Sequence, residues 1–165
     1  MPKHHERKTL PYKADQMYDL VAAMDLYPEF LPWCTGVRIR SREDGKTPEG
    51  LPCEIVTADV SIRFKMFRET FTSRDTLDSV NRTIVIEYLD GPFKYLENRW
   101  HFEESGEDCI VDFHIDFEFR SRALQALIGS LFGHAVERLM RAFEERAEVV
   151  HGGKSDQEAA PNRQL

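Results

Sequence analysis

The side chains best suited to chemistry in this chain are three cysteines and six histidines, and none of them falls into a catalytic or metal-binding spacing. Cys34, Cys53 and Cys109 are widely separated and form no CxxC pair, so neither a zinc ribbon nor a thioredoxin-like motif is predicted. His114 and Asp116 would share the exposed side of a strand, but no third metal ligand accompanies them. We therefore predict free thiols in a reducing compartment and no metal site.

Catalytic motifs are also missing from the sequence. It contains no serine-hydrolase elbow, no Walker loop and no dinucleotide-binding fingerprint. Glu54, Asp59 and Glu87 could form a carboxylate pair across neighbouring strands, but nothing in the sequence indicates that such a pair is buried. His4 and His5 are expected in a disordered N-terminal end. We predict a protein that is not an enzyme and that requires no cofactor.

Apolar side chains, in contrast, recur with the spacing of strands. Apolar and polar residues alternate along residues 109–120, with Ile110 as the one exception, and similar alternation is found in residues 54–68 and 95–104. Successive side chains of a strand point to opposite faces, so these segments predict a sheet with one dry and one wet face. The dry face is rich in phenylalanine.

The apolar period then changes from two to about 3.6, which predicts one long helix over residues 121–151. Gly129 and Gly133 interrupt it, and each costs about 1 kcal/mol of helix propensity relative to alanine. We expect a kink or a close approach to the sheet there. Because one helix covers only one face of an antiparallel sheet, the sequence predicts an α+β fold with a curved sheet around a long C-terminal helix.

The other elements complete a single domain over residues 1–152, followed by a disordered tail over residues 153–165. Two short N-terminal helices are predicted, the first over residues 14–24 and the second with Pro28 in its first turn. About six or seven antiparallel strands are predicted, over residues 8–12, 35–42, 54–68, 69–75, 83–89, 95–104 and 109–120.

Composition limits the classes of function. The 165 residues carry a formal net charge of −7, which argues against DNA or general nucleic-acid binding. No apolar run is long enough to span a bilayer, and the charged N-terminus lacks the apolar stretch of a secretory signal. We expect a soluble cytoplasmic protein.

Three segments resemble one known family. They are Tyr27-Pro28-Glu29-Phe30-Leu31-Pro32-Trp33-Cys34, then Gly91-Pro92-Phe93-Lys94-Tyr95-Leu96 with Trp100-His101-Phe102, and the helical residues 132–149. The chain is similar over residues 8–152 to the START-like (helix-grip, SRPBCC) superfamily, and within it to the coenzyme Q-binding and ribosome association toxin branch, also described as polyketide cyclase/dehydrase. Asn98 departs from this pattern, because the family is expected to favour a small residue such as glycine there.

The resemblance implies a cavity between the sheet and the long helix that binds a hydrophobic ligand. For this branch the implied ligand is ubiquinone, a polyprenyl quinone, and the implied role is to carry it in support of respiration and ubiquinone biosynthesis. Transient contact with the inner membrane is then expected. Two alternatives stay open: a toxin that acts on the large ribosomal subunit and blocks subunit joining, and a polyketide cyclase- or dehydratase-like enzyme.

The candidate ligand-binding residues combine the inward-facing aromatics with the two aromatic segments between elements. Residues 27–33 and 93–96 are predicted to form the entrance of the cavity, with Phe93 on a loop that acts as a gate. Inward-facing aromatics are ordinarily core residues, so each has a structural alternative. The full set is Tyr27, Pro28, Phe30, Leu31, Trp33, Phe64, Phe93, Leu96, Trp100, Phe102, Phe113, Phe117, Phe132, Val136 and Met140.

Overall fold

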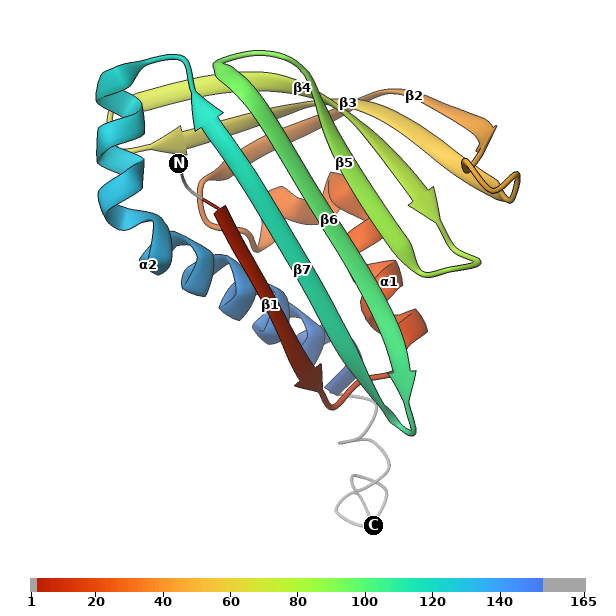
Figure 1. The fold of residues 1–165 in the computed structure, drawn as a ribbon. Helices are drawn as coiled ribbons and strands as arrows, with labels where there is room; N and C mark the ends of the chain where they lie inside the picture. The colour runs from red at the N-terminus through yellow and green to blue at the C-terminus, as the bar shows by residue number, and fades with distance from the viewer. Residues whose placement is uncertain (1–2, 153–165) are drawn as a thin grey trace.

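A computed structural model describes residues 3–152, and its central feature is one antiparallel sheet of seven strands (Figure 1). The strand order is β1-β7-β6-β5-β4-β3-β2, so β2 to β7 follow one another in sequence and β1 pairs with β7 at the opposite edge from β2. The strands are β1 (Lys3–Leu10), β2 (Cys34–Lys46), β3 (Pro52–Phe64), β4 (Phe67–Asp78), β5 (Thr83–Asp90), β6 (Phe93–Ser105) and β7 (Asp108–Phe119).

The helices all belong to the concave side of this sheet. They are α1 (Ala14–Ala22), the 3-10 helix η1 (Met24–Glu29), α2 (Arg122–Ala147) and a short π-helical turn, η2 (Glu148–Gly152). Figure 1 shows the sheet curving around α1 and α2. The predicted α+β fold is therefore confirmed, with its curved antiparallel sheet, long C-terminal helix and two short N-terminal helices. Within residues 3–152, no helix combines the length and apolarity needed to cross a membrane.

The long helix is anchored to the core near its two ends. Ser121 caps its N-terminus, because the Ser121 hydroxyl accepts a hydrogen bond from the Leu124 amide at 3.2 Å. Leu124 is buried at this end, and Val136, Met140, Phe143 and Ala147 are buried in the second half. The helical residues between Leu124 and Val136 include none that is buried. The first half of α2 therefore spans the sheet with little packing beneath it.

Two apolar clusters lie at opposite ends of the concave face. The larger one joins α1 and the second half of α2 to the sheet, and it contains Met17, Val21, Trp100, Phe102 and Phe113. The smaller one is formed by Phe93, Phe117, Phe119 and Leu124.

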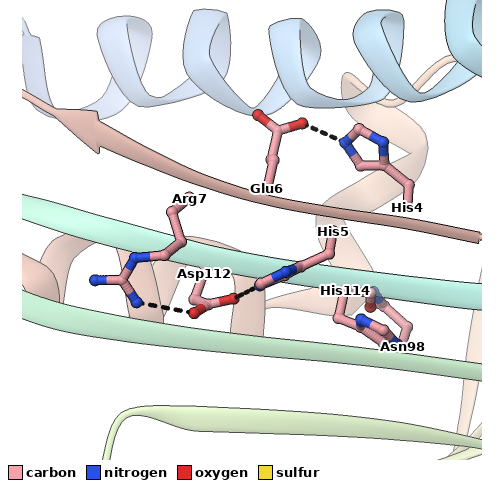
Figure 2. A network of polar contacts seen from close by, with 7 residues as sticks. All are labelled: His4, His5, Glu6, Arg7, Asn98, Asp112 and His114. Atoms are coloured by element: carbon pink, nitrogen blue, oxygen red, sulfur yellow. Dashed lines mark hydrogen bonds and ion pairs between the residues drawn. The ribbon is translucent and has the colours of Figure 1, made fainter.

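The N-terminal segment corrects one prediction, because β1 begins at Lys3 rather than residue 8. His4 and His5 are therefore strand residues opposite Ile115 and His114 of β7. Figure 2 shows that His5 and Arg7 both reach Asp112, at 2.6 and 3.0 Å. Burial alone would raise the pKa of Asp112, but the hydrogen bonds from His5 and Arg7 outweigh burial and lower it. Backbone pairing with β7 over eight residues thus holds β1 on the sheet, and these cross-strand ion pairs add to it.

A second correction concerns the strand predicted over residues 54–68. Two residues, Lys65 and Met66, form a tight turn between β3 and β4, and Lys65 has a φ of 55°. Met66 is in phase with the dry face of β3, yet it is 92% exposed because the turn lies beyond the last strand pair, Phe64 and Phe67. The alternation of apolar and polar residues continues through the two turn residues, so periodicity in the sequence did not show where the turn lies.

The entry to β2 also differs from the prediction. The short helix η1 directly follows α1 and contains Pro28 near its end, not in its first turn. The amides of Phe30 and Leu31 donate to the Tyr27 carbonyl, which closes the turn after Pro28. Further along, β2 extends to Lys46 and β3 begins at Pro52, so the loop predicted over residues 43–52 is confined to residues 47–51. The predicted tail, residues 153–165, lies outside the described residues.

The two helical glycines do not mark a close approach to the sheet. A Cβ added at Gly129 or Gly133 would meet no atom within 4 Å. Figure 1 shows instead that α2 changes direction where its colour passes from cyan to blue, as the alternative prediction of a kink proposed. No sheet residue packs closely against Gly129 or Gly133, so packing does not require glycine at either position.

Replacing both glycines with alanine should stabilise the protein. Gly129→Ala and Gly133→Ala remove backbone freedom from the unfolded chain without creating a clash, so each should add about 0.4–1 kcal/mol to the free energy of unfolding. Urea denaturation measures this change. Gly91→Ala is the matched control and should destabilise, because Gly91 has a φ of 142° and an added Cβ would lie 2.7 Å from Phe71 Cβ. Destabilisation by the two helical variants would contradict the explanation.

Candidate ligand cavity

A cavity of about 290 Å³ lies between the first half of α2 and the concave face of the sheet. This volume is close to the lower end of the range for small-molecule pockets. Seven residues of α2 face it, at the helical spacing that the sequence predicted for the apolar stripe. These residues are Leu124, Ile128, Leu131, Phe132, Ala135, Val136 and Leu139.

Nine of the sequence-predicted binding residues lie on the wall of this cavity. They come from four parts of the chain that the fold brings together: the segment around η1, strands β3 and β6, strand β7, and α2. These nine are Tyr27, Leu31, Trp33, Phe64, Phe93, Leu96, Phe117, Phe132 and Val136.

The other six predicted residues lie outside the cavity wall. Trp100, Phe102 and Phe113 belong to the larger core cluster, where the Trp100 and Phe113 ring centroids are 4.6 Å apart. Met140 is buried in the same cluster. Phe30 packs against Phe143, and Pro28 is exposed on η1. The predicted binding residues on the dry face of the sheet are thus divided between the core and the cavity wall. Trp100, Phe102 and Phe113 are therefore core residues, which is the alternative that the sequence left open for every inward-facing aromatic.

Phe93 lies on a strand and not on the loop that the sequence predicted, whereas its role as a gate stays a prediction. It is the first residue of β6 and is only 3% exposed. Its ring stacks on Phe119 at a centroid distance of 4.5 Å and meets Phe71 and Phe117 edge-on. Phe93 therefore belongs to an aromatic part of the cavity wall, where the rings of Phe71, Phe117 and Phe119 fix its position.

Trp33 lies in the turn just before β2 and combines an unusual backbone with aromatic contacts. Its φ is 70°, a region that bulky residues rarely adopt, so tertiary contacts must hold it there. The Trp33 ring meets Phe64 at 5.9 Å, and the Arg138 guanidinium of α2 lies 5.2 Å from the Trp33 ring centroid. Trp33 thus connects β3 to α2 at the edge of the cavity.

The cavity wall also carries a few polar side chains, from adjacent inward positions of the sheet. Ser73 and Asp75 of β4 and Asn98 of β6 are all buried. The Ser73 hydroxyl donates to Asp75 Oδ1 at 2.9 Å. Asn98 donates to the His114 carbonyl and accepts from the Trp100 indole, each at 2.9 Å, so its amide is held on both sides (Figure 2 shows Asn98 beside His114).

Burial changes the ionisation of Asp75. The side chain is 2% exposed, and removal from water raises the pKa of Asp75 from 3.8 to about 7, although the Ser73 hydrogen bond opposes this shift. Burial, together with the nearby Asp75 carboxyl, raises the pKa of Tyr27 well above its usual range. Below pH 7, Asp75 is therefore mostly a neutral acid that can donate a hydrogen bond into the cavity.

Sequence reasoning missed Asp75, although a signal for it was present. Asp75 alternates in phase with Phe71, Ser73 and Leu77, which all face inward. The carboxylates that the sequence singled out lie elsewhere: Asp59 pairs with Arg40 at 2.9 Å, and Glu54 and Glu87 pair with other arginines. No described group of three or more histidine, cysteine or acidic residues could hold a metal ion.

Comparison with known proteins places the chain among characterised relatives. The family model "Polyketide cyclase / dehydrase and lipid transport" matches residues 10–144. The ribosome association toxin RatA of Escherichia coli K12 is 36% identical over 155 residues, which cover 93% of this chain and 92% of RatA. The mitochondrial coenzyme Q-binding protein COQ10 homolog B of Xenopus laevis is 29% identical, over 91% of this chain and 59% of that protein.

Solved structures share the fold. The 18 kDa protein CC1736 of Caulobacter crescentus is 37% identical, with a TM-score of 0.74 over 92% of this chain and 99% of that one. A START superfamily protein of Mycobacterium smegmatis is 17% identical and has a TM-score of 0.71, over 90% of this chain and 98% of its own length. At 17% identity, the similarity to the Mycobacterium smegmatis protein shows a shared fold and nothing about function.

Replacing Asp75 with asparagine should change how stability depends on pH. Because the pKa of Asp75 is about 7 in the folded protein and near 3.8 when exposed, the folded state retains a proton that the unfolded chain loses. The free energy of unfolding should therefore fall as pH rises from about 4 to 7, by up to about 4 kcal/mol from this group. Asp75→Asn should remove this fall, as measured by urea denaturation between pH 4 and 8.

Asp59→Asn provides the control with the opposite sign. The Thr72 hydrogen bond, assisted by Arg40, lowers the pKa of Asp59, so the ionised Asp59 stabilises the fold above its usual pKa and that stability is lost as pH falls. Equal pH profiles for the wild type and Asp75→Asn would contradict the burial of an ionisable Asp75.

Proposed function

Because the chain belongs to the polyketide cyclase/dehydrase and lipid transport family, with a START-like fold, we propose that it binds a hydrophobic small molecule in the cavity beneath α2 and carries it between a membrane and other proteins. The observation that carries this proposal is the apolar wall of the cavity, to which strands β2 to β7 and seven residues of α2 contribute. Each buried methylene contributes about 0.8 kcal/mol, so such a wall holds an aliphatic or isoprenoid chain without a charged anchor.

The polar end of the cavity favours a ligand with a small hydrogen-bonding head group. Ser73 and Asp75 place a hydroxyl and a carboxyl in an otherwise apolar wall, and a neutral Asp75 would donate to a carbonyl oxygen. A quinone has carbonyl oxygens on an apolar ring with an isoprenoid chain. We therefore propose ubiquinone as the ligand, and the coenzyme Q-binding relative supports this choice.

The size of the cavity limits how much of such a ligand it can hold. Since about 290 Å³ is small for a pocket, we propose that the ring and the first part of the chain occupy the cavity. The rest of a long polyprenyl chain would then leave past the edge near Trp33, where it would need a membrane or a partner to shield it. This arrangement suits a carrier rather than a long-term store.

The same cavity offers little for catalysis, so we propose binding and release without covalent chemistry. A cyclase or dehydratase would need an acid and a base that both reach the substrate. Apart from Asp75, the acidic side chain on the described wall is Glu69, which lies six residues away on β4, about 20 Å along the strand. No histidine lines the described part of the cavity.

Quinone binding is tested first by extraction. Protein purified from a host that makes ubiquinone should release ubiquinone into organic solvent, and mass spectrometry should detect it. A short-chain quinone should also quench tryptophan fluorescence, because Trp33 lies on the cavity wall. Ala135→Phe adds a ring to the cavity wall and should weaken this binding roughly tenfold, about 1.4 kcal/mol. Ala126→Phe, exposed on the same helix, is the matched control. Equal binding by both variants would contradict the proposal.

A second candidate function rests on the relatives rather than on the cavity. Proteins named ribosome association toxin are 36% identical over 93% of this chain, so association with the large ribosomal subunit is the second proposal. In a sucrose gradient of cell extract at physiological salt, this proposal predicts that the protein sediments with free large subunits and reduces the fraction of joined ribosomes. A protein that stays at the top of the gradient would contradict it and would leave quinone binding unaffected.

A further inference from the structure

We propose that the tip of the β3–β4 hairpin, residues Phe64–Phe67, is a docking site for an anionic lipid bilayer. The proposal concerns the outer surface of the hairpin and does not depend on the identity of the cavity ligand. It rests on three observations at this tip: an exposed apolar side chain, a group of cations without acidic partners, and the position of the tip at the edge of the cavity.

The exposed apolar side chain is Met66. It is 92% exposed, the highest value among the large apolar residues of the described chain. Met66 belongs to a two-residue turn, so it projects beyond the last strand pair, Phe64 and Phe67. An isolated exposed apolar side chain is common on protein surfaces, so Met66 would carry no inference without the charges beside it.

The cations beside Met66 are Arg63, Lys65 and Arg68. All three are exposed, and no ion pair with an acidic side chain is found for them within residues 3–152. Arg63 and Arg68 lie directly opposite each other in the strand register, and like charges in that position repel. The protein as a whole has a net charge of −7, so this tip is a local exception that opposes the overall charge.

An anionic bilayer matches both features of the tip. The cations attract acidic head groups, which also relieves the repulsion between Arg63 and Arg68, while Met66 enters the boundary between head groups and acyl chains. A nucleic-acid surface would satisfy the cations, but it offers no apolar layer for Met66. Because the rest of the molecule is acidic and is repelled by an anionic surface, docking should occur through this tip and in one orientation.

That orientation places the cavity at the membrane. Phe64 and Phe67 both line the cavity, and the next residues, Lys65 and Met66, are exposed, so the tip separates the cavity from solvent. Residues of the first half of α2, such as Ile128 and Leu131, line the same cavity as Phe64 and Phe67. Docking at the tip would therefore let an apolar ligand pass between bilayer and cavity with little exposure to water.

The test is vesicle flotation of the full chain. Wild-type protein should float with vesicles of phosphatidylcholine and phosphatidylglycerol at low salt, and not with phosphatidylcholine alone. Met66→Gln should weaken the binding severalfold. Arg63→Gln together with Arg68→Gln should weaken it by roughly fivefold for each removed charge. None of these three side chains lines the cavity, so short-chain quinone binding should be unchanged and reports on the proposed function separately.

Matched controls at other places on the sheet separate a docking site from general effects. Val80→Gln removes an apolar residue that is 56% exposed in the β4–β5 turn, and Arg42→Gln with Arg99→Gln removes two exposed charges elsewhere. These variants should float like the wild type, and urea denaturation should show that all variants remain folded.

Four results would overturn the proposal. The first is no flotation of the wild type with anionic vesicles, and the second is equal loss of flotation in the control variants. The third is retention of vesicle binding by the tip variants together with loss of binding to ribosomal subunits, which would assign the tip to RNA. A change from dimer to monomer in the tip variants, with flotation unchanged, would likewise assign it to a second copy of the chain.

Discussion

The structure depends on a mismatch between one helix and the concave face of a seven-stranded sheet. Helix α1 and the second half of α2 fill one end of that face, and the cluster around Phe93 fills the other. Between them, the first half of α2 passes over the sheet with no buried residue from 125 to 135. Dense packing is the rule in protein interiors, so an apolar space of about 290 Å³ at this position is the feature that a ligand would complete.

The few polar groups of the cavity follow from the same arrangement. A charged group inside an apolar wall is costly, and Asp75 therefore has a pKa near 7 and a hydroxyl partner in Ser73. Asn98 is satisfied on both sides of its amide by its neighbours in the sheet. The wall thus combines a large apolar area with one hydrogen-bonding end, which suits a ligand with a small polar head and a long apolar chain.

The β3–β4 hairpin connects the inner and outer surfaces of the molecule. Because side chains alternate along a strand, Phe64 and Phe67 face the cavity while Arg63 and Arg68 face solvent. The same short segment therefore supplies the edge of a ligand cavity and a cationic surface on an otherwise acidic protein. A carrier needs these two properties at one place, since its ligand must leave the bilayer and enter the cavity without crossing water.

The sequence by itself determined the architecture and the direction in which most side chains point. Period-two alternation and the long helical stripe are local properties, so they correctly placed Phe117 on the dry face of β7 and Phe132 on the inward face of α2. The family resemblance added the cavity, and nine of the predicted binding residues do line it.

Tertiary structure alone decided which part of the dry face is core and which part is cavity. Five aromatic or apolar residues point to the same inward face of β6 and β7: Trp100, Phe102, Phe113, Leu96 and Phe117. The first three are core residues, because α1 and Phe143 cover the sheet where they lie. Asp75 and Met66 show the same limit, since the alternation places both on the inward face. Asp75 is buried because neighbouring strands surround it, whereas Met66 is exposed because it lies in the turn beyond the last strand pair. Periodicity reports the face of a strand, whereas burial depends on distant segments that the fold brings to that face.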